Sequence, residues 1–188
     1  DPRFRRMLAL KRLLPHLAED PAHVDMFLDE ARLAARLEHV GLVPVYDVGD
    51  DRGVPFFVMP LIEGVDLRRL GYECARTGLR MPPGLVALVG RELLDALEYA
   101  HELRDEDGRH LHVIHRDISP GNVLVSWHGD VRLVDFGIAR AGGRTSRTAA
   151  GQLKGKISYM APEQLLGADV DARADIFAVG AVLAELLT

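Results

Sequence analysis

Short apolar runs alternate along the chain with longer stretches of helical periodicity, which predicts strands and helices together. An Asp-Pro pair at residues 20–21 precedes one such stretch, and Asp followed by Pro is a favourable helix start. We therefore expect an α+β fold. The predicted strands are residues 7–10, 42–48, 54–59, 123–125 and 131–134, and the predicted helices are residues 21–37, 67–75, 85–103 and 171–188.

One acidic residue lies on the apolar face of the predicted helix 21–37. Phe27, Ala31, Ala34 and Leu37 share this face at helical spacing, and Glu30 falls among them. A carboxylate on a buried face is strongly unfavourable unless it meets a cation. The pattern therefore predicts a positively charged partner for Glu30.

A boundary between two parts of the chain is predicted near residues 60–64. Pro60 is expected to end strand pairing, and Gly64 indicates a turn. We accordingly divide the chain into residues 1–62, with most of the predicted strands, and residues 63–188, with most of the predicted helices.

A predicted hairpin brings oxygen-bearing side chains together. Asn122 immediately precedes its first strand, Asp135 follows its second, and residues 127–130 form the turn. The far ends of a hairpin lie side by side, with Asp117 just upstream. Hard oxygen ligands that converge in this way suit Mg²⁺.

Composition and charge exclude several classes of protein. The chain is 48% hydrophobic with a net charge of −5, which is typical of a globular domain and not of a nucleic-acid binder. Its single cysteine excludes an internal disulfide framework. His110, His112 and His115 cluster, but with no cysteine or paired ligand spacing among them a zinc site is disfavoured, and His115 is better interpreted as a core residue. No stretch is long and apolar enough to predict a membrane span.

Four short motifs stand in a fixed order along the chain. They are Ala9-Leu10-Lys11 followed by Glu30; His115-Arg116-Asp117 followed by Asn122; Asp135-Phe136-Gly137; and Ala161-Pro162-Glu163. This ordered set resembles the signature of protein kinases. The resemblance covers essentially all 188 residues, and the stretch SYMAPEQ at 158–164 is typical of bacterial serine/threonine kinases of the eukaryotic type. It implies a two-lobed protein-kinase-like fold, truncated at both ends.

The resemblance implies an ATP-dependent protein kinase with named roles. Lys11 would hold the α- and β-phosphates of ATP and Glu30 would orient it, while Asp117 would accept the proton of the substrate hydroxyl. Asn122 and Asp135 would bind Mg²⁺. The expected nucleotide contacts, besides Lys11 and Asp135, are Ala9 and Leu124 around the adenine, Met59, Pro60, Leu61 and Ile62 along the hinge, and Asp66 at the ribose.

The resemblance also implies a protein substrate and control by phosphorylation. Arg116 beside Asp117 suggests regulation through the loop at 141–155, with self-association for autophosphorylation as one route. The candidate phosphosites are Thr145, Ser146 and Thr148. We expect no nucleic-acid partner and a cytoplasmic location, either free or as the cytoplasmic portion of a longer membrane-anchored protein.

The chain departs from the family pattern at both ends and at two internal positions. The Gly-rich loop, the first two strands and the last helices have no counterpart, so we expect an inactive fragment of a longer gene product. Ser119 stands where most serine/threonine kinases carry a lysine that touches the γ-phosphate. Lys156 stands where they carry a threonine, and it is one of only three lysines. We hypothesise that Lys156 replaces the missing charge.

Two other functions compete with kinase activity. The chain could be a pseudokinase or scaffolding module that binds nucleotide without turnover, although all five residues of the catalytic set are present. It could also phosphorylate a small molecule. The Ala161-Pro162-Glu163 segment argues against the second alternative, since in the family it helps to build a peptide-docking surface.

Overall fold

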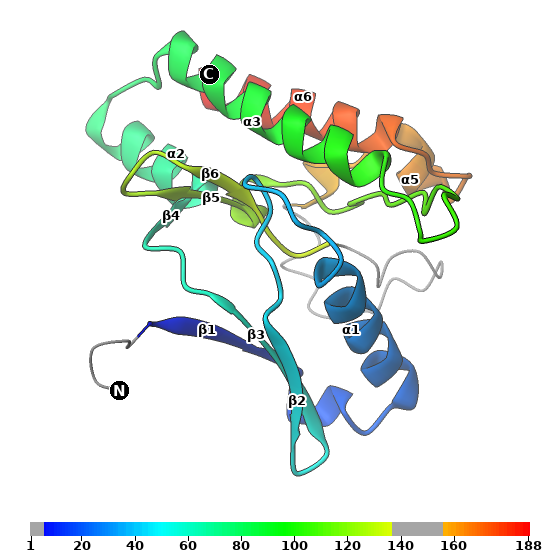
Figure 1. Cartoon of the computed structure of the whole chain (residues 1–188). Coiled ribbons are helices and arrows are strands. Elements are labelled where there is room, and N and C mark those ends of the chain that lie inside the picture. Colours follow the sequence, from blue (N-terminus) through cyan, green and yellow to red (C-terminus); the bar gives the residue numbers. More distant parts are fainter. Residues whose placement is uncertain (1–5, 137–155) are drawn as a thin grey trace.

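The computed structural model describes residues 6–136 and 156–188 as strands and helices in an α+β arrangement, as predicted (Figure 1). The strands are β1 (Leu8–Arg12), β2 (Asp47–Asp51), β3 (Val54–Pro60), β4 (Gly64–Asp66), β5 (Val123–Ser126) and β6 (Val131–Leu133). The helices are α1 (Pro21–Ala34), α2 (Leu67–Thr77), α3 (Pro83–His101), α5 (Pro162–Leu166) and α6 (Arg173–Leu187). Short 3₁₀ turns lie at Pro15–Leu17, Pro120–Asn122 and Ile157–Tyr159.

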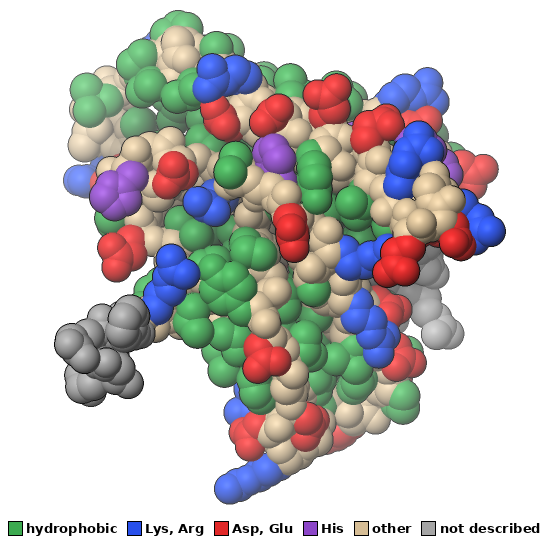
Figure 2. Space-filling model, viewed as in Figure 1, with side chains coloured by type: hydrophobic (Ala, Val, Ile, Leu, Met, Phe, Trp, Pro, Cys, Tyr) green, Lys and Arg blue, Asp and Glu red, His purple; other side chains and the backbone are tan. Residues whose placement is uncertain are grey.

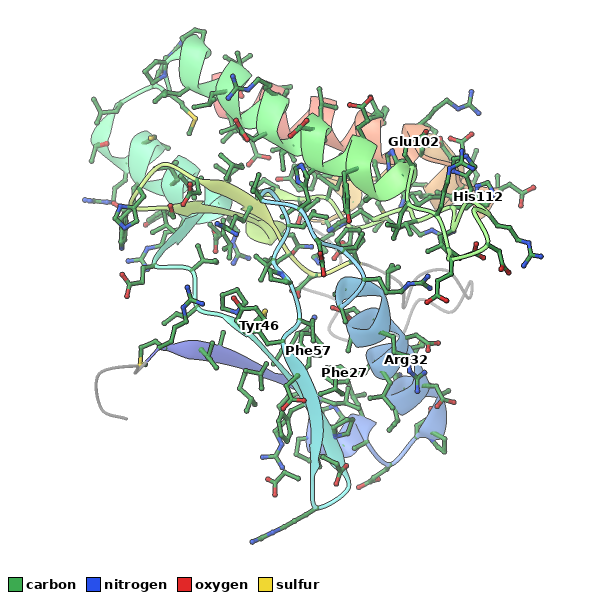
Figure 3. The ribbon with its side chains drawn as sticks, in the orientation of Figure 1. Phe27, Arg32, Tyr46, Phe57, Glu102 and His112 are labelled. Carbon is green, nitrogen blue, oxygen red and sulfur yellow. The ribbon has the colours of Figure 1, made fainter. Side chains whose placement is uncertain are left out.

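The first sheet is antiparallel, with β3 between β1 and β2, and α1 packs against it (Figure 1). Asp20 caps α1 as predicted, because its side chain accepts a hydrogen bond from Ala22 N at 3.0 Å. Phe27 on α1 and Phe57 on β3 face each other with ring centroids 5.0 Å apart (Figure 3). With Ala31 they form a small apolar cluster that fixes α1 on the sheet.

The second sheet, in the order β4-β5-β6, lies beside the main helical layer. Figure 1 shows α3 and α6 side by side, and the two helices pack closely together. The larger apolar core fills the space between this sheet and these helices. Its most deeply buried large side chains are Leu37, Leu42, Leu67, Leu93, Leu97, Val123, Leu133, Val179 and Val182.

The chain between α1 and β2 docks on the second sheet, which corrects the predicted strand 42–48. Leu133 N donates to Gly41 O at 2.8 Å, and Val43 N donates to Leu133 O at 3.1 Å. Leu42 forms an isolated parallel bridge there and is fully buried. Because these residues pair with β6 and Pro44 has no N–H to donate, pairing with β3 starts with Tyr46 N and continues through β2.

Residues 64–66 form a strand where the sequence indicated only a turn. Gly64 pairs with Ser126, and a Cβ at this position would stand 2.0 Å from Val125 O. The glycine is therefore required by close backbone approach and not by a turn. Pro60, expected to end pairing, is still the last residue of β3 and pairs with Leu8. The division at residues 62 and 63 stays a prediction.

Charged side chains of both signs are interspersed on the face shown in Figure 2. Within residues 6–136 and 156–188, the structure contains no helix with the length and apolar character needed to cross a bilayer.

Candidate active site

Lys11 lies at the centre of a three-membered ionic cluster. Its Nζ is 2.5 Å from Glu30 Oε1 and 2.7 Å from Asp135 Oδ1. The lysine comes from β1, the glutamate from α1 and the aspartate from the end of the β5–β6 hairpin. Phe57 on the neighbouring strand places its ring centroid 5.2 Å from the ammonium. The cation that the sequence required for Glu30 is thus Lys11.

Burial and charge act in opposite directions on this pair. Burial alone would lower the pKa of Lys11, but the charges of Asp135 and Glu30 outweigh it, so this pKa lies above its ordinary value. Burial raises the pKa of the Glu30 carboxyl, and the Lys11 charge offsets the effect only partly. Lys11 therefore stays charged, and a fall in pH breaks the pair by protonating the Glu30 carboxylate.

The hairpin brings Asn122 and Asp135 to one end, as the sequence predicted. Val134 N donates to Asn122 O at 3.0 Å, which ties the start of β5 to the residue before Asp135. Asn122 Nδ2 donates to Asp117 O at 2.7 Å and to Asp117 Oδ2 at 3.0 Å. Since Asp117 engages the amide nitrogen, the amide oxygen is the atom of Asn122 that can serve as a metal ligand.

Asp175 on α6 holds the backbone just before Asp117. Its carboxylate accepts from His115 N and from Arg116 N, each at 2.8 Å, and is 2.8 Å from His101 Nε2. Arg116 has a φ of 64°, a left-handed conformation that is strained for a residue with a side chain. The two hydrogen bonds to the buried carboxylate compensate for this strain, so Asp175 has a structural role.

His115 is a core residue, as the sequence indicated. It is fully buried, and its ring contacts that of Phe136 with centroids 4.6 Å apart. Its Nε2 lies 3.1 Å from Val134 O. Burial lowers the pKa of His115 below its ordinary value, so the imidazole is neutral near pH 7.

A cavity of about 350 Å³ lies between the two sheets, next to the ionic cluster. Most of its wall is apolar, while Lys11 and Asp135 supply charge. This combination suits a nucleotide, whose base is largely apolar and whose phosphates are anionic. The predicted nucleotide contacts that line it are Ala9, Lys11, Met59, Pro60, Leu61, Ile62, Leu124 and Asp135.

One of the predicted nucleotide contacts does not line this cavity. Asp66 is not among the residues that line it; instead its carboxylate accepts from Arg69 N at 2.7 Å and caps α2. The candidate phosphosites Thr145, Ser146 and Thr148 lie outside the described residues.

Lys156 reaches the side chain of Asp117. Its Nζ is 2.5 Å from Asp117 Oδ2, although the two residues are 39 positions apart in the sequence. Ser119, two positions after Asp117, is 5% exposed and brings no charge.

Sequence analysis missed two residues that secure this site. Gln164 Nε2 donates to Arg116 O at 3.0 Å, and its Oε1 accepts from Ala161 N at 3.0 Å, so α5 is fastened to the loop that carries Asp117. The motif containing Gln164 was recognisable, but its contact was not. His101 ends α3 and meets Asp175 across the core, a contact that no local pattern indicates.

Comparisons with known proteins agree with this geometry. A sequence model described as "Protein kinase domain" matches residues 3–188. The tyrosine-protein kinase MasK of Myxococcus xanthus is 44% identical over 188 residues, which is 98% of this chain and 29% of that protein. The serine/threonine-protein kinase PknL of Mycobacterium tuberculosis is 41% identical over 188 residues, covering all of this chain and 44% of that protein.

Solved structures agree as well. The crystal structure of the Mycobacterium tuberculosis PknI kinase domain matches with a TM-score of 0.72 at 32% identity, covering 99% of this chain and 65% of that one. The chain thus spans less than half the length of the two curated relatives named above. The predicted kinase-like fold is confirmed, and with a family match over nearly every residue the chain belongs to the protein kinase family.

Proposed function

We propose that this chain is the catalytic portion of an ATP-dependent protein serine/threonine kinase. The observation that carries the proposal is the convergence of Lys11, Glu30 and Asp135 at one end of the cavity, with Asp117 and Asn122 joined to the same hairpin. These five side chains come from four separate segments, and phosphoryl transfer depends mainly on such positioning and charge neutralisation.

Each of these residues would have a separate role in phosphoryl transfer. Lys11 would hold the α- and β-phosphates, with its position fixed by Glu30, while the apolar cavity wall would receive the adenine. The hydroxyl oxygen of the substrate forms a bond to the γ-phosphorus as the bond to the β–γ bridging oxygen breaks. The hydroxyl proton passes to Asp117, and ADP leaves with the electron pair of the broken bond.

Asn122 and Asp135 are the side chains that would hold Mg²⁺. An amide oxygen and a carboxylate at one end of a hairpin are hard oxygen donors, which fit this ion. When bound, Mg²⁺ would neutralise charge on the phosphates. Asp135 already balances Lys11 at 2.7 Å, so the same carboxylate would link the lysine to the metal. We propose Asp66 as a ribose contact only from the family resemblance, because its carboxylate caps α2.

A second cavity, of about 360 Å³, fits control by phosphorylation. It lies between α1 and the loop after α3, where Figure 3 labels Arg32 and His112. Arg36 and Arg116 complete a basic lining, with Asp29 paired to Arg32 at 2.8 Å. Guanidinium groups gathered in this way suit a phosphorylated side chain. Autophosphorylation at Thr145, Ser146 or Thr148 is the proposed source, through self-association of two copies.

The test is transfer of radiolabelled γ-phosphate from Mg·ATP by the full-length gene product. We expect incorporation that disappears in Asp117→Asn and persists in Asp107→Asn, a matched change at an exposed loop carboxylate whose side chain is 70% accessible. Phosphoamino-acid analysis decides between serine or threonine and tyrosine, a choice raised by the name of the MasK relative. ATP binding without any incorporation would favour the alternative, a nucleotide-binding pseudokinase.

A cytoplasmic location is proposed because the reaction draws on cytoplasmic ATP. Protein substrates are proposed because α5 belongs to the Ala161-Pro162-Glu163 segment, which is fastened beside Asp117 through Gln164.

A further inference from the structure

We propose that Lys156 supplies the cation that contacts the transferred phosphoryl group, so that this charge comes from the segment before α5 and not from the loop that carries Asp117. The inference rests on the proposed kinase function and deepens it. Its starting point is the 2.5 Å contact between Lys156 Nζ and Asp117 Oδ2.

The charges around the site create the need for a second cation. Glu30, Asp117 and Asp135 bring three carboxylates together, and the phosphates of ATP would add further negative charge. Lys11 is already shared between Glu30 and Asp135. Among the described residues, Lys156 is the other lysine whose ammonium contacts one of these acids.

The ammonium of Lys156 can bind Asp117 and a phosphate oxygen together. A lysine ammonium carries three N–H donors on a flexible stem, and Asp117 uses one of them. The acceptor hydroxyl and the γ-phosphate must meet next to Asp117, because this residue takes the hydroxyl proton. The side chain of Lys156 is 35% exposed and that of Asp117 is 12% exposed, so the pair is shielded but still reachable by substrate.

The backbone that follows Lys156 is anchored at two points. The 3₁₀ turn Ile157–Tyr159, which Lys156 precedes, packs against α6, and the Tyr159 hydroxyl donates a hydrogen bond to Glu185 Oε2. A few residues further on, Gln164 bonds Arg116 O at 3.0 Å. Both anchors follow Lys156 in the chain, so the fold holds the backbone on the C-terminal side of this lysine.

The position two residues after Asp117 is buried and carries no charge in this chain. Ser119 is 5% exposed and its carbonyl oxygen accepts from Asn122 N at 2.9 Å, so the backbone there is committed to the turn Pro120–Asn122. A lysine introduced at Ser119 would restore the usual family arrangement only if its long side chain emerged toward the phosphate. Moving the lysine from position 156 to position 119 is therefore a direct experiment.

The experiment uses the full-length gene product and four variants: Lys156→Thr, Lys156→Arg, Ser119→Lys with Lys156→Thr, and the surface control Arg173→Ala. Each is assayed for kcat and, by calorimetry, for its Kd for Mg·ATP and for Mg·ADP. We expect Lys156→Thr to lower kcat and to weaken ATP binding, each on the order of ten-fold, as for loss of a charge-assisted hydrogen bond. ADP binding should stay unchanged because ADP lacks the γ-phosphate.

Two comparisons complete the test. Lys156→Arg should retain more of the preference for Mg·ATP over Mg·ADP than Lys156→Thr does. The double variant should regain the preference that Lys156→Thr loses. Arg173→Ala should match the parent, since its side chain is 89% exposed and its ion pair is with the nearby surface residue Asp171. If the double variant does not fold, as a thermal melt would reveal, the Arg and Thr variants alone still decide the question.

The outcomes separate this inference from the kinase proposal. If the parent protein shows no turnover but Lys156→Thr selectively loses ATP affinity, the function fails and the inference stands. The role of Lys156 would be overturned if Lys156→Thr lost ATP and ADP affinity equally. It would also be overturned if the parent were active and Lys156→Thr had the same kcat. A rise in kcat would also overturn it, because the contact with Asp117 would then be inhibitory.

Discussion

Removal of the Asp175 carboxylate should destabilise the fold and loosen the loop before Asp117. The aspartate is 1% exposed and accepts from two backbone amides, those of His115 and Arg116, while also meeting His101. In Asp175→Ala these donors lose their acceptor inside the core. Each buried donor left without a partner costs about 1–3 kcal/mol.

The expected loss of stability is therefore about 3–5 kcal/mol, the range for breaking a buried charged contact from one side. For a domain of this size each kcal/mol shifts the melting temperature by about 2–4 °C, so Tm should fall by about 6–20 °C. Asp175→Asn keeps one carboxylate-like oxygen and should lose less. Asp107→Ala, at an exposed loop carboxylate whose side chain is 70% accessible, is the matched control and should leave Tm unchanged.

Two measurements together test this reasoning. Thermal unfolding followed by circular dichroism gives the change in Tm, and amide hydrogen exchange with mass spectrometry reports on the peptide that contains His115 and Arg116. Faster exchange of that peptide at temperatures well below Tm is the specific expectation, since its amides bond directly to Asp175. Unchanged exchange, or a Tm within 2 °C of the parent, would refute the assigned role.

Three further predictions concern other parts of the fold. Gly64→Ala should lower Tm sharply because its Cβ would stand 2.0 Å from Val125 O, whereas Gly71→Ala, with nothing within 4 Å, should raise stability by up to ~1 kcal/mol. Burial lowers the pKa of His115 below 6.5, so stability is complete above pH 6.5 and is lost as pH falls toward the lowered value; His115→Gln should flatten this fall in pH-dependent melts. Burial raises the pKa of Glu30, so this carboxylate should be protonated, and ATP affinity should fall, at a higher pH than for an exposed glutamate. A plot of ATP affinity against pH for Glu30→Gln should lack this fall.

Features governed by local pattern could be predicted from the sequence. The hairpin of β5 and β6 follows from two apolar runs around a turn, and its ends place Asn122 beside Asp135 whatever surrounds them. The demand of Glu30 for a cation follows from its place on an apolar helix face, and Lys11 meets that demand. The hairpin is predictable because its two strands are close in the sequence, and the ion pair is predictable because a carboxylate on an apolar helix face requires a cation.

Features that depend on distant partners could not be predicted. Leu42 and Val43 look like strand residues, but β6 competes for their backbone groups, and this competition is invisible in the local pattern. Gly64 has the composition of a turn, yet its lack of a side chain serves close pairing with β5. The hydrogen bond from Gln164 to Arg116 O joins residues 48 positions apart and depends on how α5 is placed.

The acids of the site show why its geometry belongs to the fold as a whole. Glu30 on α1 fixes a lysine on β1, and Asp175 on α6 fixes the backbone before Asp117, so each helix controls one half of the reacting centre. A shift of α1 away from the sheet would separate Glu30 from Lys11 without changing any residue of the motifs. Packing of Phe27 on Phe57 opposes that shift, and loss of this apolar contact should weaken ATP binding even though neither ring is a predicted nucleotide contact.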